Sequence, residues 1–188
     1  GVAAEIAFIR ERAAEAGRLQ EGLAEGRLPL RVTHNDTKLN NVMIDDATGA
    51  AVCVIDLDTV MPGLSLYDFG DAIRSGTSTA EEDERDLEKV AMDPALFEGF
   101  ARGFLETAGP ALTDAETNLL AFSAKLITLE IGVRFLADHL EGDVYFRIHR
   151  TGHNLDRARN QFRLVADMEA QMPRMEAIIH RLCGPSPH

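Results

Sequence analysis

Helical periodicity is the feature that most constrains the fold, because it dominates the sequence beyond Pro62-Gly63. We predict a short helix near residues 69–74 and another helix that opens at Asp93-Pro94. A long helix starts at the capping box of Thr113 and Glu116 and runs to about residue 139. A last helix begins at about residue 154, bends or breaks at Pro173 and stops at Gly184-Pro185. We expect the acidic run of residues 81–88 to be a solvated face. This part of the chain is therefore predicted to be α-rich.

One small β-hairpin is the exception to this helical pattern. Residues 2–24 are rich in Ala, Glu, Leu and Arg and predict a first helix, which Pro29 closes. A polar loop of residues 33–41 follows, too dense in Asn and Asp to be regular structure. Two short apolar runs, residues 42–44 and 51–55, then flank a turn that contains a glycine, which predicts a hairpin. The fold class is therefore mainly α with a small β-hairpin.

Charge and cysteine content narrow the kinds of partner. The 188 residues contain 19 Lys and Arg against 31 Asp and Glu, a net charge of −12, which argues against sequence-independent binding to nucleic acid or to anionic membrane. Cys53 and Cys183 form neither a disulfide framework nor a zinc pattern. The longest apolar stretch, residues 119–140, is broken by charged residues, so we expect a buried helix and not a membrane span. The amphipathic pattern at the start of the sequence leads us to expect no secretory signal. We expect a cytoplasmic protein with a small polar substrate.

The chemistry-bearing residues lie in the polar loop and directly after the hairpin. The loop includes His34-Asn35-Asp36-Thr37-Lys38-Leu39-Asn40-Asn41, and Val54-Ile55-Asp56-Leu57-Asp58 follows the hairpin. Phosphoryl transfer needs a loop Asp that accepts the substrate hydroxyl proton, an Asn on Mg²⁺ five residues later, and a second metal-binding Asp. These are Asp36, Asn41 and Asp56, and the spacing selects Asn41 over its neighbour Asn40. The two strands return the chain to where it left, so both metal ligands are expected at one end of the hairpin.

Three further residues of this region have two interpretations each. Lys38 could place its ammonium group on the transferring phosphoryl oxygens, or it could be a solvated loop cation. Asp58 could be a third metal ligand or a hydrogen-bonding residue. For His34 we favour a structural role, with its ring packed against the Asp56 segment. The pattern as a whole predicts a kinase-type site that uses Mg²⁺ and ATP.

Two other motifs resemble functional sites but are interpreted as structural. Asp68-Phe69-Gly70 spells the metal motif of protein kinases, yet it lies twelve residues past Asp56 at the mouth of a helix. We therefore interpret Asp68 as a helix cap or a loop brace. His149 and His153 are four residues apart, but Gly152 interrupts any helix there and no Glu completes a zinc-protease signature.

These motifs resemble the aminoglycoside phosphotransferase and choline kinase superfamily over residues 30–74, with its His-x-Asp-x₄-Asn loop and its Ile-Asp segment. Longer segments are similar to the N-acetylhexosamine 1-kinases: residues 34–43, 54–63 and 67–72, then Gly132-Val133-Arg134-Phe135-Leu136, Gly142-Asp143-Val144-Tyr145-Phe146 and residues 154–159. The resemblance implies transfer of the ATP γ-phosphate to the anomeric hydroxyl of an N-acetylhexosamine.

The resemblance also implies that Arg134 and Tyr145 line the sugar pocket beside Asp36. Arg134 is a cation with five donors in a mostly apolar helix, where it needs an acceptor. An ion pair with Glu130, four residues earlier, would supply one without any substrate. Tyr145 could equally be a core residue.

The chain departs from the superfamily in one large respect. Complete enzymes of this kind have an N-terminal, mostly β lobe that covers the nucleotide phosphates, and nothing before residue 33 is rich in strands or has a glycine-rich loop. Residues 1–188 are therefore expected to be the C-terminal catalytic lobe of the protein-kinase-like α+β fold, inactive on its own. The alternatives are an aminoglycoside, choline or other small-alcohol phosphotransferase, or an inactive kinase-like binding module.

Overall fold

The structure is a computed structural model that describes residues 1–184. Its α-helices are α1 (Ala3–Arg12), α2 (Arg18–Ala24), α3 (Ser65–Gly76), α4 (Pro94–Ala108), α5 (Asp114–Thr117), α6 (Leu120–Glu141) and α7 (His153–Cys183). The strands are β1 (Arg31–Thr33), β2 (Val42–Ile44), β3 (Ala51–Val54) and β4 (Met61–Gly63). Short 3₁₀ helices are η1 (Ala13–Glu15), η2 (Leu39–Asn41), η3 (Leu57–Thr59), η4 (Leu87–Lys89) and η5 (Gly109–Ala111). The mainly α class predicted from the sequence is confirmed.

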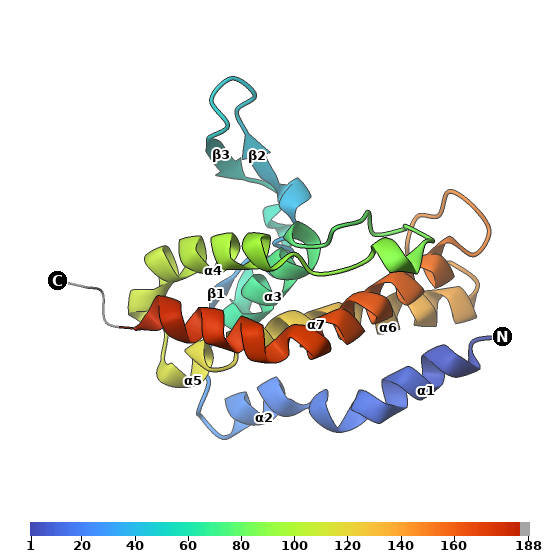
Figure 1. Cartoon of the computed structure of the whole chain (residues 1–188), viewed down its shortest axis with the longest axis horizontal. Helices are drawn as coiled ribbons and strands as arrows, with labels where there is room; N and C mark the ends of the chain where they lie inside the picture. Colours follow the sequence, from blue (N-terminus) through green and yellow to red (C-terminus); the bar gives the residue numbers. More distant parts are fainter. Residues whose placement is uncertain (185–188) are drawn as a thin grey trace.

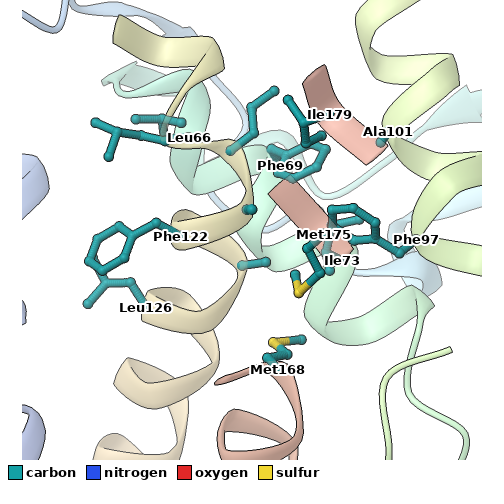
Figure 2. Packing of buried hydrophobic residues seen from close by; sticks show 14 of the residues in the cluster. Leu66, Phe69, Ile73, Phe97, Ala101, Phe122, Leu126, Met168, Met175 and Ile179 are labelled. Atoms are coloured by element: carbon teal, nitrogen blue, oxygen red, sulfur yellow. The ribbon is translucent and has the colours of Figure 1, made fainter. Parts of the chain in front are cut away.

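The core lies between α3, α4, α6 and α7, whose buried side chains meet in one cluster (Figure 2). Phe69 of α3 packs edge-on against Phe97 of α4, with ring centroids 6.2 Å apart. Gly70 lets α3 approach α6 closely, because a Cβ at this position would lie 2.7 Å from the Ser123 carbonyl oxygen. The Phe and Gly of the apparent metal motif thus serve helix packing.

The N-terminal helices lie along the outside of this core, beside α6 and α7 (Figure 1). Ion pairs join α1 to α7, from Arg12 to Glu169 and from Arg159 to Glu5. The single helix predicted over residues 2–24 was wrong, since it is broken into α1, η1 and α2. Gly17 lies at this break, directly before α2. A glycine inside a helix is less stable there than most other residues, so it disfavours a continuous helix.

The predicted hairpin is confirmed as the antiparallel pair β2–β3, which projects from the helical body (Figure 1). A second antiparallel pair, β1–β4, was not predicted. Each of its strands has three residues, and Pro62 lies within β4, where a proline removes a ladder donor. Gly63 is required there because a Cβ would clash with the Thr33 hydroxyl. This pair joins the polar loop to the segment after the hairpin.

The later helices differ from the prediction in their bounds. The capping box of Thr113 and Glu116 is present, but the helix it starts ends at Thr117, and α6 begins after a turn at Leu119. The opening at Asp93-Pro94 is confirmed, with the Asp93 side chain capping α4. The helix predicted near residues 69–74 is the middle of the longer α3.

Helix α7 is continuous through Pro173, so of the two predicted alternatives, a bend or a break, the break was wrong. Pro173 is solvent-exposed, where a proline ring is tolerated better than inside a packed interface. The helix ends at Cys183, next to the predicted stop at Gly184, while Pro185 lies outside the described residues. Both cysteines are free and exposed. Within residues 1–184, no helix combines the length and the apolar character needed to cross a lipid bilayer.

Candidate active site

Asp68, in the first turn of α3, fixes the polar loop that follows β1. Its two carboxylate oxygens accept the backbone N–H groups of His34 and Asn35, at 2.8 and 2.7 Å. The Thr37 hydroxyl donates to the Asp68 carbonyl oxygen at 2.5 Å. The interpretation of Asp68 as a loop brace is confirmed. Asn35 takes a left-handed conformation with φ of 63°, which Asn tolerates better than most residues.

Asp36 lies at the centre of this loop, in contact with two of the predicted site residues. The Lys38 ammonium donates to Asp36 Oδ2 at 2.7 Å, and Asn41 Nδ2 donates to the same oxygen at 2.9 Å and to the Asp36 carbonyl at 2.8 Å. Burial alone would raise the pKa of Asp36, but these donors outweigh it and hold the pKa below its ordinary value. The carboxylate is therefore charged at neutral pH and partly open to solvent.

The segment after the hairpin is tied to the same loop. The Ile55 backbone N–H donates to the Asn41 carbonyl at 2.9 Å, and His34 Nε2 lies 3.0 Å from the Ile55 carbonyl oxygen. The structural role favoured for His34 is thus confirmed. Asp56 follows in a left-handed conformation, with φ of 62° and ψ of 56°, and its side chain is exposed. Such a conformation costs energy and is often retained at functional sites.

The donor set around this junction fits Mg²⁺ chemically. No group of three or more His, Cys, Asp or Glu side chains suited to a metal occurs in residues 1–184. Mg²⁺ nevertheless takes one or two protein oxygens and fills its remaining positions with water and substrate phosphates. The Asn41 amide turns its nitrogen to Asp36, so its oxygen is the atom left to ligate a cation. Asp56 and Asp58 supply exposed carboxylates, Asp58 from within η3.

A cavity of about 560 Å³ opens beside Asp36. Of the predicted site residues, Asp36, Lys38, Arg134 and Tyr145 line it. A second cavity of about 410 Å³ shares both Asp36 and Arg134 with the first. The structure thus brings together the residues chosen for catalysis and those chosen for substrate binding. The metal residues Asn41, Asp56 and Asp58 are not in the lining of either cavity.

Arg134 and Tyr145 form part of the cavity wall, and both are exposed. The Arg134 guanidinium carbon lies 5.7 Å from the ring centroid of Tyr145 and 5.5 Å from that of Phe146. The alternative ion pair with Glu130 is absent from the ion pairs of the described residues, because the guanidinium turns to these rings instead. Tyr145 is 72% exposed, so the alternative of a core residue was wrong.

Four charged residues that line the cavity were not predicted as site residues: Arg74, Glu81, Glu82 and Arg157. Glu82 accepts from Arg74 of α3 at 2.8 Å and from Arg157 of α7 at 3.0 Å. The acidic run of residues 81–88 is therefore not simply a solvated face. Arg74 also pairs with Asp71, three residues earlier, at 2.9 Å, so the sequence near Arg74 contained a carboxylate partner and no signal for Glu82 or Arg157.

The pair of histidines near the start of α7 is structural. His153 is buried, its Nδ1 accepts the backbone N–H of His149 at 3.2 Å, and its Nε2 lies 3.0 Å from Asp83 Oδ2. Both ring nitrogens are thus used within the fold. This agrees with the interpretation from the sequence, in which Gly152 precludes a helical metal pair and instead caps α7.

A comparison with protein-family models places these features in a known context. The model described as the phosphotransferase enzyme family matches residues 2–112. The matched region contains Asp36, Lys38, Asn41, Asp56 and Asp58, together with the Asp68 brace. It covers more than half of the chain and stops before the residues of α6 that line the cavity.

Proposed function

Because the chain belongs to the phosphotransferase enzyme family, we propose that it is the catalytic lobe of a small-molecule kinase that phosphorylates the anomeric hydroxyl of an N-acetylhexosamine. ATP is the proposed phosphoryl donor and Mg²⁺ the proposed cofactor, as is general in this family. The observation that carries the proposal is the charged carboxylate of Asp36 at the edge of a cavity that Arg134 also lines.

Asp36 is the proposed acceptor of the substrate hydroxyl proton. Its carboxylate orients the attacking oxygen, and its lowered pKa suits a group whose main contribution is positioning. The Lys38 ammonium contacts Asp36, and we propose that it stabilises charge on the transferring phosphoryl oxygens. Asn41 and Asp56, with Asp58 as a third candidate, would hold Mg²⁺, whose chemistry is to neutralise phosphate charge.

The charges around the cavity favour a neutral polar acceptor. Its cationic lining residues are Lys38, Arg74, Arg134 and Arg157, and its anionic ones are Asp36, Glu81 and Glu82. With four cations against three anions, the cavity lacks the acidic excess that would attract a polycationic aminoglycoside. Choline would need free aromatic faces for its quaternary ammonium, yet the Arg134 guanidinium already lies against Tyr145 and Phe146.

Arg134 supplies the selectivity in this proposal. Its guanidinium has no hydrogen-bonded acceptor among the described residues, so its donors are available to ring hydroxyls or to an N-acetyl carbonyl. A site built to hydrogen-bond a substrate group discriminates strongly against analogues that lack the group, because its own donors are left unpaired. Tyr145 adds an aromatic face and a hydroxyl beside it.

We further propose that a nucleotide-covering lobe packs on the hairpin side of this chain. Val32 of β1, Val52 of β3 and Leu57 of η3 are 83%, 64% and 60% exposed. A group of exposed apolar residues of this kind is typical of an interaction surface. An inactive binding module remains the alternative function, and the intact set of Asp36, Asn41 and Asp56 argues against it.

The test compares kcat/KM of the full-length protein for N-acetylglucosamine, N-acetylgalactosamine, choline and an aminoglycoside. An N-acetylhexosamine is expected to be the best substrate, and Arg134→Ala should lower its kcat/KM by at least about tenfold while the KM for ATP changes little. Arg102→Ala, on the exposed face of α4, is the matched control and should behave like the wild type. If choline or the aminoglycoside is preferred, the sugar assignment fails. Inactivity on all four would favour the binding module.

A further inference from the structure

The loop that carries Tyr145 is organised around one buried carboxylate, Asp138 of α6. Asp138 Oδ1 accepts the backbone N–H groups of Val144 and Tyr145 at 2.9 and 2.7 Å, and Oδ2 accepts that of Phe146 at 2.9 Å. Three successive amides of the loop thus converge on a side chain that is 4% exposed. Hydrogen bonds to an ionised carboxylate are stronger than those between neutral groups, so this cluster stabilises the loop conformation.

Two further bonds fasten the same loop to α6 and α7. The Asp143 backbone N–H donates to the Asp138 carbonyl at 2.7 Å, after Gly142 has ended α6 in a left-handed conformation with φ of 100°. Asn154 of α7, itself fully buried, donates from Nδ2 to Asp138 Oδ2 at 2.8 Å and to Asp143 Oδ1 at 2.9 Å. The loop therefore cannot shift without breaking contacts to both helices.

We call the hydrogen bonds that Asp138 and Asn154 make to residues 143–146 the clamp. Aromatic contacts connect the clamp to the wall of the cavity. Phe146 packs on Phe135 of α6 with ring centroids 4.6 Å apart, and Tyr145 meets Phe146 edge-on at 4.8 Å. Arg134 lies against both rings of the loop. Asp138 does not line either cavity beside Asp36, so any effect on an acceptor must pass through these neighbours.

We propose that Asp138 is a positioning residue for acceptor binding, which holds Tyr145 and Phe146 against Arg134 at the cavity wall. This rests on the proposed function, since it assumes that the cavity binds the acceptor. Burial alone would raise the pKa of Asp138, but the three amide donors outweigh it and hold the pKa below the ordinary value. The carboxylate therefore stays charged and keeps its acceptor capacity at neutral pH.

Asp138→Asn tests the clamp with almost no change in volume. The Asn oxygen can accept from Val144 and Tyr145, but its NH₂ group then faces two other donors, the Phe146 amide and the Asn154 amide nitrogen. In the full-length protein we expect the KM for the acceptor to rise by about tenfold or more and the KM for ATP to stay within about twofold. Hydrogen exchange of the 144–146 amides should accelerate at the same time.

Glu5→Gln is the matched control, because Glu5 of α1 is a buried carboxylate that accepts from Arg159 at 2.6 Å and is not in the lining of either cavity beside Asp36. It should lower thermal stability without changing the KM for the acceptor or the exchange of the 144–146 amides. Asn154→Ala is a second test of the clamp, to be used if Asp138→Asn does not fold. It removes one of the hydrogen bonds to Asp138 and should raise the acceptor KM by about two- to fivefold.

The outcomes separate this proposal from the proposed function. An active wild type with an unchanged acceptor KM in the folded variants overturns the positioning role and leaves the function standing. Equal increases in the KM values for acceptor and ATP also overturn it, because they indicate general loosening. Amides of residues 144–146 that exchange as fast in the wild type as in Asp138→Asn would show that no clamp exists. A wild type that phosphorylates none of the acceptors removes the proposed function and the positioning role with it.

Discussion

A carboxylate that orients a hydroxyl for phosphoryl transfer must be charged when the substrate arrives, and the neighbours of Asp36 keep it so. Asp36→Asn retains the shape of the side chain and removes the charge. In the full-length protein we expect kcat to fall by about 10²- to 10⁴-fold, while the KM for ATP changes by less than about threefold, since this group acts mainly on the transition state. Steady-state kinetics with saturating acceptor measure both values.

Asp45→Asn is a suitable control for that experiment. Asp45 is an exposed carboxylate in the turn of the hairpin, where it accepts hydrogen bonds from the Thr48 N–H and hydroxyl. Its kcat should equal that of the wild type. A kcat above half of the wild-type value in Asp36→Asn would remove Asp36 from the proposed mechanism.

The metal assignment gives a second prediction for single residues. Asn41→Ala and Asp56→Ala should each raise the Mg²⁺ concentration for half-maximal rate by about tenfold or more, because each removes a proposed ligand from a site with few protein oxygens. Asp46→Ala, which removes an exposed carboxylate from the hairpin turn, should leave the Mg²⁺ titration unchanged. Wild-type titrations in both ligand variants would place the metal elsewhere.

The site could be predicted from the sequence where its parts are close along the chain. Asp36, Lys38 and Asn41 lie within six residues, and the contacts among them in the structure follow from that spacing. Arg74, Glu82 and Arg157 meet because α3 and α7 both pack against α6, so no local pattern could have assembled all three. The roles assigned to Asp36, Asn41, Asp56, Arg134 and Tyr145 stay predictions.

At the scale of elements, periodicity identified the helices better than their ends. The helix α6 was predicted from its helical pattern, and the hairpin β2–β3 was predicted from two short apolar runs that flank a turn containing a glycine. The β1–β4 pair has only three residues on each strand, too few for alternation to be recognised. The capping box of Thr113 and Glu116 is present, so the predicted start of a helix was correct. The predicted length of that helix was wrong, because α5 ends at Thr117 and α6 follows after a turn.

Helix α7 gives a prediction for an element, because it continues through Pro173. A proline within a helix removes one backbone hydrogen bond and its ring crowds the preceding turn. Pro173→Ala should therefore raise the free energy of unfolding by about 1 to 2 kcal/mol, somewhat less than the full propensity difference, since proline also restricts the unfolded chain. Urea unfolding measures this difference. Arg174→Ala, at the exposed neighbouring position, should change it by less than about 0.5 kcal/mol.

At the scale of the whole molecule, Glu116 joins three parts of the fold. Its Oε1 accepts from Arg31 Nε of β1 at 2.6 Å and from the Ser65 hydroxyl at the start of α3 at 2.7 Å. Its Oε2 accepts the Thr113 backbone N–H at 2.8 Å, completing the capping box of α5. The strand that leads into the Asp36 loop is thus anchored to the helical body through one carboxylate.

This junction predicts how the stability of the protein depends on pH. Burial alone would raise the pKa of Glu116, but hydrogen bonds from Arg31, Thr113 and Ser65 outweigh it and lower the pKa from 4.5 to about 2. Between these two values the unfolded chain binds a proton that the folded protein does not. The contribution of Glu116 is therefore complete above about pH 5 and is lost as the pH falls toward 2.

The measurement is the free energy of unfolding from urea titrations at several pH values between 2 and 7. Glu116→Gln should be less stable than the wild type at pH 7, and the difference should shrink by about 1 to 2 kcal/mol on going to pH 2.5, a figure reduced for solvent screening because Arg31 is 27% exposed. Glu88→Gln, at an exposed position, should follow the wild-type curve at every pH. A difference between Glu116→Gln and the wild type that is the same at pH 7 and pH 2.5 would mean that Glu116 contributes by packing alone. The junction of β1, α3 and α5 would then not depend on its charge.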